Sequence, residues 1–260
     1  YSSAASDVYK RQGEILTLCG DMRACGALCV GGAGASGAAM GEILRAELAA
    51  HGFAGKLLLC GDHEIALAGA MQTPGCVLIA GTGSICYGKN ATGENFRCGG
   101  GGHIIDDPGS GYALGRDALA AALQTEDGRL SENALHGAVM DTVGGSGIQG
   151  IFDFVYFSRR GKGDIAALAP LVLRCAAQGD AVSLDILRRG AAELARLVSA
   201  VMGKLGLENG SPCALAGGLL AEDNVYRRAV CAALAPFCRP AAPEHDALFG
   251  AVQLALAAIQ

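Results

Sequence analysis

The sequence has little of what marks several large classes of protein. It contains no tryptophan, only 17% of its residues are charged, and its formal net charge is −5. Nucleic-acid-binding proteins usually carry clustered Lys and Arg, so this balance predicts no nucleic-acid partner. No apolar run reaches the roughly 20 residues that cross a membrane, and no signal-peptide pattern is visible. We therefore expect a cytoplasmic protein with no membrane partner.

The cysteines also lack the spacing of a metal site or a disulfide framework. There are 11 of them, and no two stand in a C-x-x-C arrangement. Most fall in short apolar segments, where a reduced thiol packs as a small apolar side chain. Reduced core thiols of a cytosolic protein are the expectation, and an iron–sulfur site is the alternative.

The chain does have the material for a substantial core. Its 260 residues are 51% hydrophobic, with 40 glycines against 7 prolines. Strand-like and helix-like patterns alternate, which predicts an α/β fold. Residues 1–12 do not fit this pattern and look like a translated adaptor or assembly scar, so we expect the native N-terminus to be missing.

The expected elements can be placed from periodicity and turn residues. Strands are predicted at residues 27–30, 56–60, 76–80, 85–88, 95–98 and 212–215, and helices at 14–19, 64–71, 112–124, 224–234 and 247–259, with a helical region from 131 to 205 and a proline-rich loop at 236–243. Three helix faces are predicted: Met40, Ile43, Leu44 and Leu48; Ile165, Leu168, Leu171, Val172 and Cys175; and Leu187, Ala191, Leu194, Val198, Val201 and Leu205. A domain boundary is expected at the turn 73–75.

Small or acidic residues follow three of the predicted strands. They are Asp62, the segment Gly81-Thr82-Gly83-Ser84, and the pair Gly217-Gly218. Ligands of open α/β sheets gather at the carboxyl ends of strands, and glycine lets backbone N–H groups approach phosphate oxygens. A nucleotide lying on two of these loops, with an acceptor hydroxyl facing Asp62, would suit phosphoryl transfer. The alternative for Asp62 is a helix N-cap.

A second reading starts from the glycines at residues 32–37, which satisfy G-x-G-x-x-G between a strand and a helix. With Asp62 ending the next strand, this imitates a dinucleotide-binding fingerprint. The spacing to Asp62 is long, and the later glycine motifs stay unexplained. A dehydrogenase is therefore the weaker alternative.

A glycine-rich acidic segment lies at a predicted helix entrance, between Arg97 and Gly115. Its two adjacent carboxylates, Asp106 and Asp107, suit hydroxyl recognition, although an ordinary hairpin with polar turns has the same composition. Asp106 fits a solvated turn residue better than a catalytic one. His103 fits ligand binding and turn packing equally.

These pieces, in their order and spacing, resemble the BadF/BadG/BcrA/BcrD ATPase family, which includes the N-acetylglucosamine kinases of the actin-like and sugar-kinase superfamily. The similarity runs from about Val30 to Leu256. The segments that carry it are Gly61-Asp62 with Ala66–Ala70, Leu78–Ser84, Arg97–Gly115, Ala214–Gly218 and Gly250-Ala251.

The resemblance implies a ribonuclease H-like (actin-like ATPase) fold with two lobes. Residues 13–73 with 247–260 would form an incomplete N-terminal lobe, and residues 74–246 the C-terminal lobe. ATP and Mg²⁺ would be the cofactors, and no residue of this chain is assigned as a metal ligand. The implied roles are catalytic base for Asp62; cofactor binding for Gly81, Thr82, Gly83, Ser84, Gly217 and Gly218; and sugar binding for Asp107, Thr82, Ser84, Gly102 and His103.

Three departures from the family pattern bear on activity. The family's N-terminal D-G-G-G-T phosphate loop is missing, Gly101 stands where an aromatic residue is common, and Pro108 stands where Glu is usual. A proline at 108 removes a carboxylate and biases Asp107 toward an extended backbone.

The sequence thus favours an ATP-dependent kinase that phosphorylates a small-molecule amino sugar, with activity impaired in the 260-residue chain. One alternative is an ATPase that activates a partner reductase or dehydratase, although the clustered cysteines of such activators are not evident. The other is a catalytically impaired sugar- or nucleotide-binding protein. A homodimer stays open.

Overall fold

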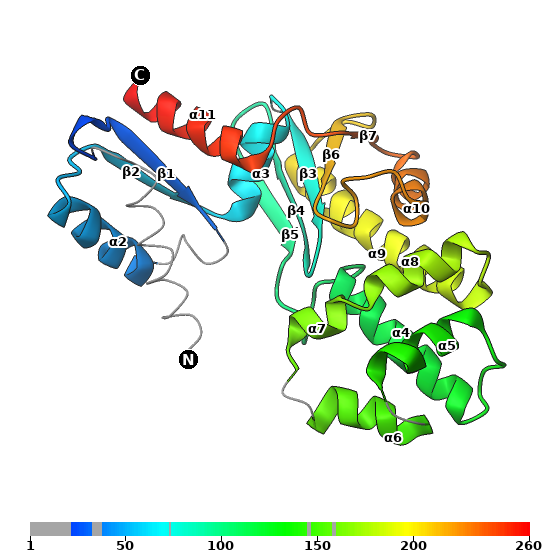
Figure 1. The fold of residues 1–260 in the computed structure, drawn as a ribbon. Helices are drawn as coiled ribbons and strands as arrows, with labels where there is room; N and C mark the ends of the chain where they lie inside the picture. The colour runs from blue at the N-terminus through cyan, green and yellow to red at the C-terminus, as the bar shows by residue number, and fades with distance from the viewer. Residues whose placement is uncertain (1–21, 33–37, 73, 145–146, 158–159) are drawn as a thin grey trace. The chain divides into compact units, whose positions relative to one another are not determined.

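The fold is that of a computed structural model, which describes residues 22–32, 38–72, 74–144, 147–157 and 160–260 (Figure 1). The predicted helix at 14–19 and most of the glycine motif at 32–37 lie outside the described residues. The chain divides into two compact units, which are described separately below. Unit 1 is residues 1–70 with 244–260, and unit 2 is residues 71–243.

Unit 1 is built on a two-stranded parallel sheet. β1 (Ala27–Gly31) pairs with β2 (Lys56–Cys60), α2 (Ala38–Ala50) connects them, and a short 3-10 helix, η1 (Met22–Ala24), precedes β1. Leu44 and Leu48 of α2 pack into a core with Met22 and Phe53. The prediction that Ile43 shares their buried face is wrong, because Ile43 is 48% exposed. Successive helical residues point about 100° apart, so Ile43 turns away from the side chain of Leu44.

Two helices of unit 1 meet at backbone distance. They are α3 (Asp62–Ala70) and α11 (Ala247–Ile259). A Cβ on Gly69 would lie 2.0 Å from the carbonyl oxygen of Asp246, and a Cβ on Gly250 would lie 2.0 Å from that of Ile65. Both positions therefore require glycine.

Unit 2 is built on a five-stranded mixed sheet in the order β5-β4-β3-β6-β7. The strands are β3 (Gly75–Ala80), β4 (Ser84–Lys89), β5 (Asn95–Gly99), β6 (Pro212–Ala216) and β7 (Arg239–Ala241). The β3–β4 and β4–β5 pairs are antiparallel, whereas β3–β6 and β6–β7 are parallel. The carboxyl ends of β3 and β6 consequently meet at one edge of this sheet.

Strand β7 corrects the prediction of a plain loop at residues 236–243. It pairs with β6 at the sheet edge, and the N–H of Arg239 donates to the carbonyl oxygen of Ser211 at 3.0 Å. Successive N–H groups of a strand alternate sides, so the nitrogen of Pro240 points away from β6. Proline is tolerated in such an edge position because no ladder hydrogen bond is lost.

Helices supply most of the core of unit 2. They are α4 (Gly111–Glu126), α5 (Ala134–Val143), α6 (Gly147–Phe152) with the π-helical turn η2 (Asp153–Phe157), α7 (Lys162–Ala166), α8 (Ala169–Ala177), α9 (Ala181–Leu205) and α10 (Val225–Leu234). The predicted stripe at residues 165–175 is divided between two helices. Ile165 lies in α7, Leu168 lies in the break before α8, and the other three members lie in α8.

The stripe predicted on α9 is confirmed, since all six of its members are buried. Asp180 caps the start of this helix by accepting a hydrogen bond from the Ser183 N–H, and Gly206, with φ +62°, ends it. Within the described ranges, no single helix is long and apolar enough to cross a membrane. Residues 162–177 and 181–205 together have the length and composition of a membrane span, but the two helices are bent by 118° at the break between them.

Candidate functional site

Two glycine loops lie side by side at the shared carboxyl edge of β3 and β6. Gly81–Gly83 follows β3, and Gly217-Gly218 follows β6. Gly217 has φ +87°, and a Cβ there would lie 2.4 Å from the carbonyl oxygen of Ala80. The N–H of Leu219 donates to that same oxygen at 3.1 Å. The second loop is thus held against the end of β3, and only glycine allows that approach.

The loop after β3 is fixed by the start of α4. The N–H groups of Gly111 and Tyr112 donate to the carbonyl oxygens of Gly81 and Thr82, at 2.7 and 3.3 Å. Among the described residues, the N–H groups of Thr82 and Gly83 have no hydrogen-bond acceptor, and Thr82 is exposed. The loop therefore presents two backbone donors, which is the arrangement that binds anionic oxygens.

Asp107 joins this loop to the glycine-rich acidic segment. The residue is 2% exposed. Its Oδ1 accepts a hydrogen bond from the Ser84 N–H at 3.3 Å, and its Oδ2 accepts one from Lys162 Nζ at 2.7 Å. The hydroxyl of Ser84 donates to the carbonyl oxygen of Pro108 at 2.7 Å. The carboxylate is therefore held from β4 and from α7 at once.

The backbone of Asp107 contradicts the extended conformation expected before Pro108. Its φ is +58°, in the left-handed region. Aspartate adopts this region more readily than most residues, and the hydrogen bonds to Ser84 and Lys162 hold it there against the preference imposed by proline.

The rest of the acidic segment forms a closed turn. The Asp106 carboxylate accepts a hydrogen bond from the Gly101 N–H at 2.8 Å, so Asp106 stabilises the turn itself. Gly102 has φ +93° with open space where a Cβ would lie. The ring of His103 meets the ring of Tyr112 edge to face, with centroids 4.7 Å apart. Gly102, through its backbone conformation, and His103, through its ring contact, thus take part in shaping the turn.

Asp62 lies in unit 1, at the carboxyl end of β2. It is the first residue of α3 and not the residue before it, so the predicted N-cap role is wrong. Glu64 does the capping, since its Oε1 accepts a hydrogen bond from the Gly61 N–H at 2.9 Å. Asp62 is exposed, and its Oδ1 lies 3.0 Å from the backbone nitrogen of His63 and 3.3 Å from its Nδ1. The hydrogen bond from the His63 ring lowers the pKa of Asp62, and the backbone hydrogen bond adds to this.

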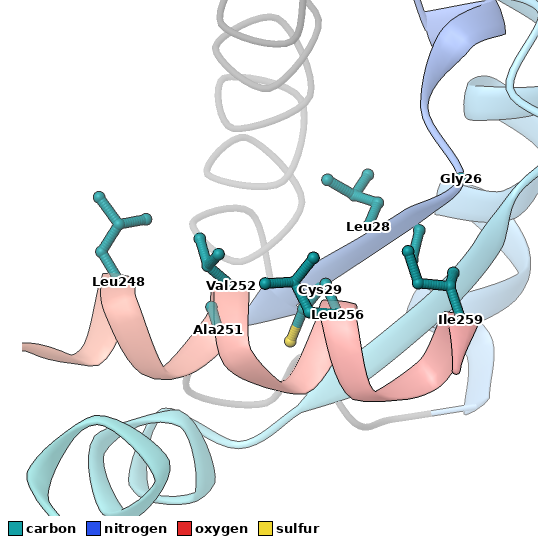
Figure 2. Close-up of a pocket in the computed structure, with 10 residues that line it drawn as sticks. Gly26, Leu28, Cys29, Leu248, Ala251, Val252, Leu256 and Ile259 are labelled. Carbon is teal, nitrogen blue, oxygen red and sulfur yellow. The ribbon is translucent and has the colours of Figure 1, made fainter.

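Two of the hollows that lie away from these loops, in the described part of the chain, have contrasting linings. One, of about 390 Å³, is an apolar groove between β1 and α11 in unit 1, where Leu248, Val252 and Leu256 line one side (Figure 2). The other, of about 610 Å³, has His103, Asp106, Arg116 and Arg189 in its wall. The first lacks the polar groups that a sugar needs, whereas the second borders the acidic segment.

Cysteines do not form a metal site in the described part of the chain. The ten described cysteines are free thiols, and no cluster of three or more His, Cys, Asp or Glu side chains could hold a metal ion there. Cys76, Cys86 and Cys213 are buried in the sheet of unit 2, as expected for core thiols.

Lys162 is the site residue that the sequence reasoning missed. It stands in a short helix after a polar turn and belongs to no recognisable motif, so only the fold brings it to Asp107. A glycine-rich loop by itself gives no indication of which distant cation will reach it.

Comparison with curated proteins finds two sugar kinases. The chain is 39% identical over 186 residues to an N-acetylmuramic acid/N-acetylglucosamine kinase of Clostridium acetobutylicum, an alignment that covers 71% of this chain and 61% of that protein. It is 31% identical over 174 residues to an N-acetyl-D-glucosamine kinase of Dictyostelium discoideum, covering 65% and 53%. The chain therefore matches little more than half the length of these curated relatives.

Solved structures agree on the fold. A protein of Chromobacterium violaceum, provisionally named an N-acetylglucosamine kinase, superposes with a TM-score of 0.65 at 30% identity, covering 85% of this chain and 72% of that one. A similarly named protein of Porphyromonas gingivalis gives 0.72 at 18% identity, covering 96% and 84%. The expected α/β fold of the actin-like sugar kinases is confirmed. The BadF/BadG/BcrA/BcrD ATPase family model matches residues 18–255, and the chain belongs to that family.

Proposed function

We propose that the protein is an ATP-dependent kinase of an N-acetylated amino sugar. The observation that carries this proposal is the pair of glycine loops at one sheet edge, with the N–H groups of Thr82 and Gly83 available to phosphate oxygens. The names of the two curated relatives supply the substrate class.

Each loop takes a separate part of the nucleotide in this proposal. Gly81–Ser84 binds phosphate through backbone donors, and Ser84 also fixes Asp107. Gly217-Gly218 has no side chains to obstruct the adenosine, and Gly218 has open space where a Cβ would lie. Asp107, Gly102 and His103 face the sugar, with Thr82 and Ser84 at the boundary between sugar and phosphate.

Asp62 acts as the general base on the sugar hydroxyl. A base must be deprotonated when it acts, and the hydrogen bond from His63 lowers the pKa of Asp62. Aspartate is already a carboxylate at neutral pH, and the lowered pKa keeps Asp62 in that form to more acidic pH while making it a weaker base. Asp62 is also exposed, so that a hydroxyl can approach it.

Mg²⁺ fits this site as a companion of ATP. The described residues offer no side-chain metal cluster, and Mg²⁺ is commonly held by one or two carboxylates together with substrate phosphates and waters. The ion would neutralise charge on the transferring phosphoryl group.

The test is acceptor-dependent ADP release with N-acetylglucosamine, N-acetylmuramic acid and glucose. It is run on the 260-residue chain, which matches only part of the length of its curated relatives. Asp62→Asn should lower turnover by roughly 10²- to 10⁴-fold, the usual contribution of a general base. Asp141→Asn, at an exposed position on α5, is the control and should keep its activity.

Three results would contradict the proposal. Turnover without any sugar that rises with a reductase or dehydratase partner would indicate an activating ATPase. Tight binding of sugar or nucleotide with no turnover would indicate a binding protein. Equal turnover in Asp62→Asn and the wild type would remove Asp62 from catalysis. A cytoplasmic location is part of the proposal and is checked by cell fractionation, whereas the homodimer stays open and is decided by light scattering.

A further inference from the structure

The carboxylate of Asp107 is buried and its charge is balanced from outside its own segment. Its side chain is 3% exposed, whereas that of its partner Lys162 is 32% exposed. A buried carboxylate is stable only if its oxygens are hydrogen-bonded and its charge is paired. Lys162 supplies the positive charge, and the Ser84 N–H supplies a second donor on the other oxygen.

Lys162 is held in place by its helix and not by its flexible side chain alone. α7 packs on α4 so closely that a Cβ on Gly115 would lie 1.9 Å from the carbonyl oxygen of Ile165. The turn before α7 is closed by the Gly161 N–H, which donates to the Asp164 carboxylate at 2.7 Å. The ammonium group therefore enters the site from a fixed direction.

The ammonium group also lies against the loop proposed to bind phosphate. A Cβ on Gly83 would lie 3.0 Å from Lys162 Nζ and 3.0 Å from both carboxylate oxygens of Asp107. The Asp107–Lys162 ion pair thus packs against Gly83, so a shift of the ion pair would also shift the loop Gly81–Ser84.

We infer that Lys162 is a positioning residue: it holds the Asp107 carboxylate in one orientation, so that the remaining lone pairs of Asp107 can accept hydrogen bonds from sugar hydroxyls. This inference rests on the proposed function, because it assigns Lys162 a part in sugar recognition. A carboxylate has about four lone-pair sites, and the two observed contacts leave some of them unfilled.

Three substitutions separate charge from hydrogen bonding. Lys162→Met removes both, Lys162→Gln keeps a donor without the charge, and Lys162→Arg keeps the charge. Lys204→Met, at an exposed position in the last turn of α9, is the matched control. Steady-state kinetics are measured with sugar and ATP varied independently, and sugar binding is measured separately by calorimetry.

The expected result is a selective loss of sugar affinity. Lys162→Met should raise KM for the sugar by roughly 10- to 100-fold, the range for losing hydrogen bonds to a charged group, with KM for ATP within about twofold of wild type. Lys162→Arg should recover most of the loss and Lys162→Gln less. In an Asp107→Asn background, Lys162→Met should cost no more than about twofold further, since the two residues act together.

Two outcomes would overturn the inference while leaving the kinase proposal intact. In the first, the wild-type enzyme phosphorylates the sugar, and Lys162→Met has the same KM values as the control Lys204→Met. In the second, KM for ATP rises instead and does so in the Asp107→Asn background as well, which would make Lys162 a direct phosphate ligand. A wild-type enzyme with no sugar-dependent turnover would instead count against the proposed function. If Lys162→Met does not fold, the contrast between Lys162→Arg and Lys162→Gln decides the matter.

Discussion

At the scale of single residues, the pair Asp62 and His63 shows how a neighbour in the chain tunes a carboxylate. Because a hydrogen bond from the His63 ring lowers the pKa of Asp62, the charged form of Asp62 persists to more acidic pH. The associated stability is present above the unfolded-state pKa of Asp62 and is lost as pH falls through the lower, folded-state value.

His63→Ala should therefore raise the pKa of Asp62 and move the acidic limb of the activity profile to higher pH. His51→Ala, an exposed histidine at the end of α2 in the same unit, should leave both unchanged. Carbon-13 NMR titration of the Asp62 carboxyl group measures the first effect without any assay. An unchanged titration in His63→Ala would show that the histidine ring has no influence on Asp62.

The sequence predicts residues of this site unevenly. Glycines and carboxylates that follow strands are visible because their chemistry and position coincide, as at Gly81 and Gly217. Lys162 was not visible, since a lysine in a helical region has the same appearance whether it faces solvent or a buried aspartate. The left-handed backbone of Asp107 was also missed, because its cause is a contact with α7, 55 residues away along the chain.

At the scale of elements, the crossing of α3 and α11 depends on two glycines. At Gly69 and Gly250 the backbones of the two helices are in direct contact. A side chain at either position would therefore displace a helix, because the nearest atoms are backbone atoms and not a side chain that could move aside by changing its rotamer. Asp62 begins α3, and this crossing therefore supports one end of the proposed catalytic residue's helix.

Gly69→Ala should destabilise unit 1 by about 1–3 kcal/mol, the usual cost of overpacking. Gly137→Ala on α5 is the control, since a Cβ there meets nothing within 4 Å and the helix should gain about 0.5–1 kcal/mol from the better helix former. Urea denaturation followed by circular dichroism measures both changes. A neutral Gly69→Ala would mean that the two helices separate without cost.

Element prediction succeeded for the long helix α9 and for the five- and six-residue strands β1 to β6, and it failed for the break between α7 and α8 and for strand β7. The apolar stripe lies on α9, a helix of 25 residues, and its period is unambiguous. The break between α7 and α8 and the three-residue strand β7 leave no periodic signal, because tertiary contacts define them.

At the scale of the whole molecule, burial is distributed unequally between the units. The core of unit 2 unites α9 with β3, β6 and the helices around them, whereas the described cores of unit 1 are two small clusters. Slow-exchanging amides belong to the elements whose opening requires global unfolding.

Hydrogen exchange should accordingly be slowest in α9, β3 and β6 and distinctly faster in β1, β2 and α2. Exchange mass spectrometry of the intact chain resolves these segments by peptide. Equal protection of α2 and α9 would contradict the ranking and would show that both units open together.

The outward nitrogen of Pro240 has a consequence for how copies of this chain behave at high concentration. An edge strand with a full row of N–H groups is a template for another strand, and pairing of that kind starts aggregation. The middle residue of β7 is Pro240, which has no N–H group. A carbonyl oxygen of an incoming strand would therefore be left without a hydrogen-bond donor at this position. Pro240 thus protects the exposed side of the sheet from self-association.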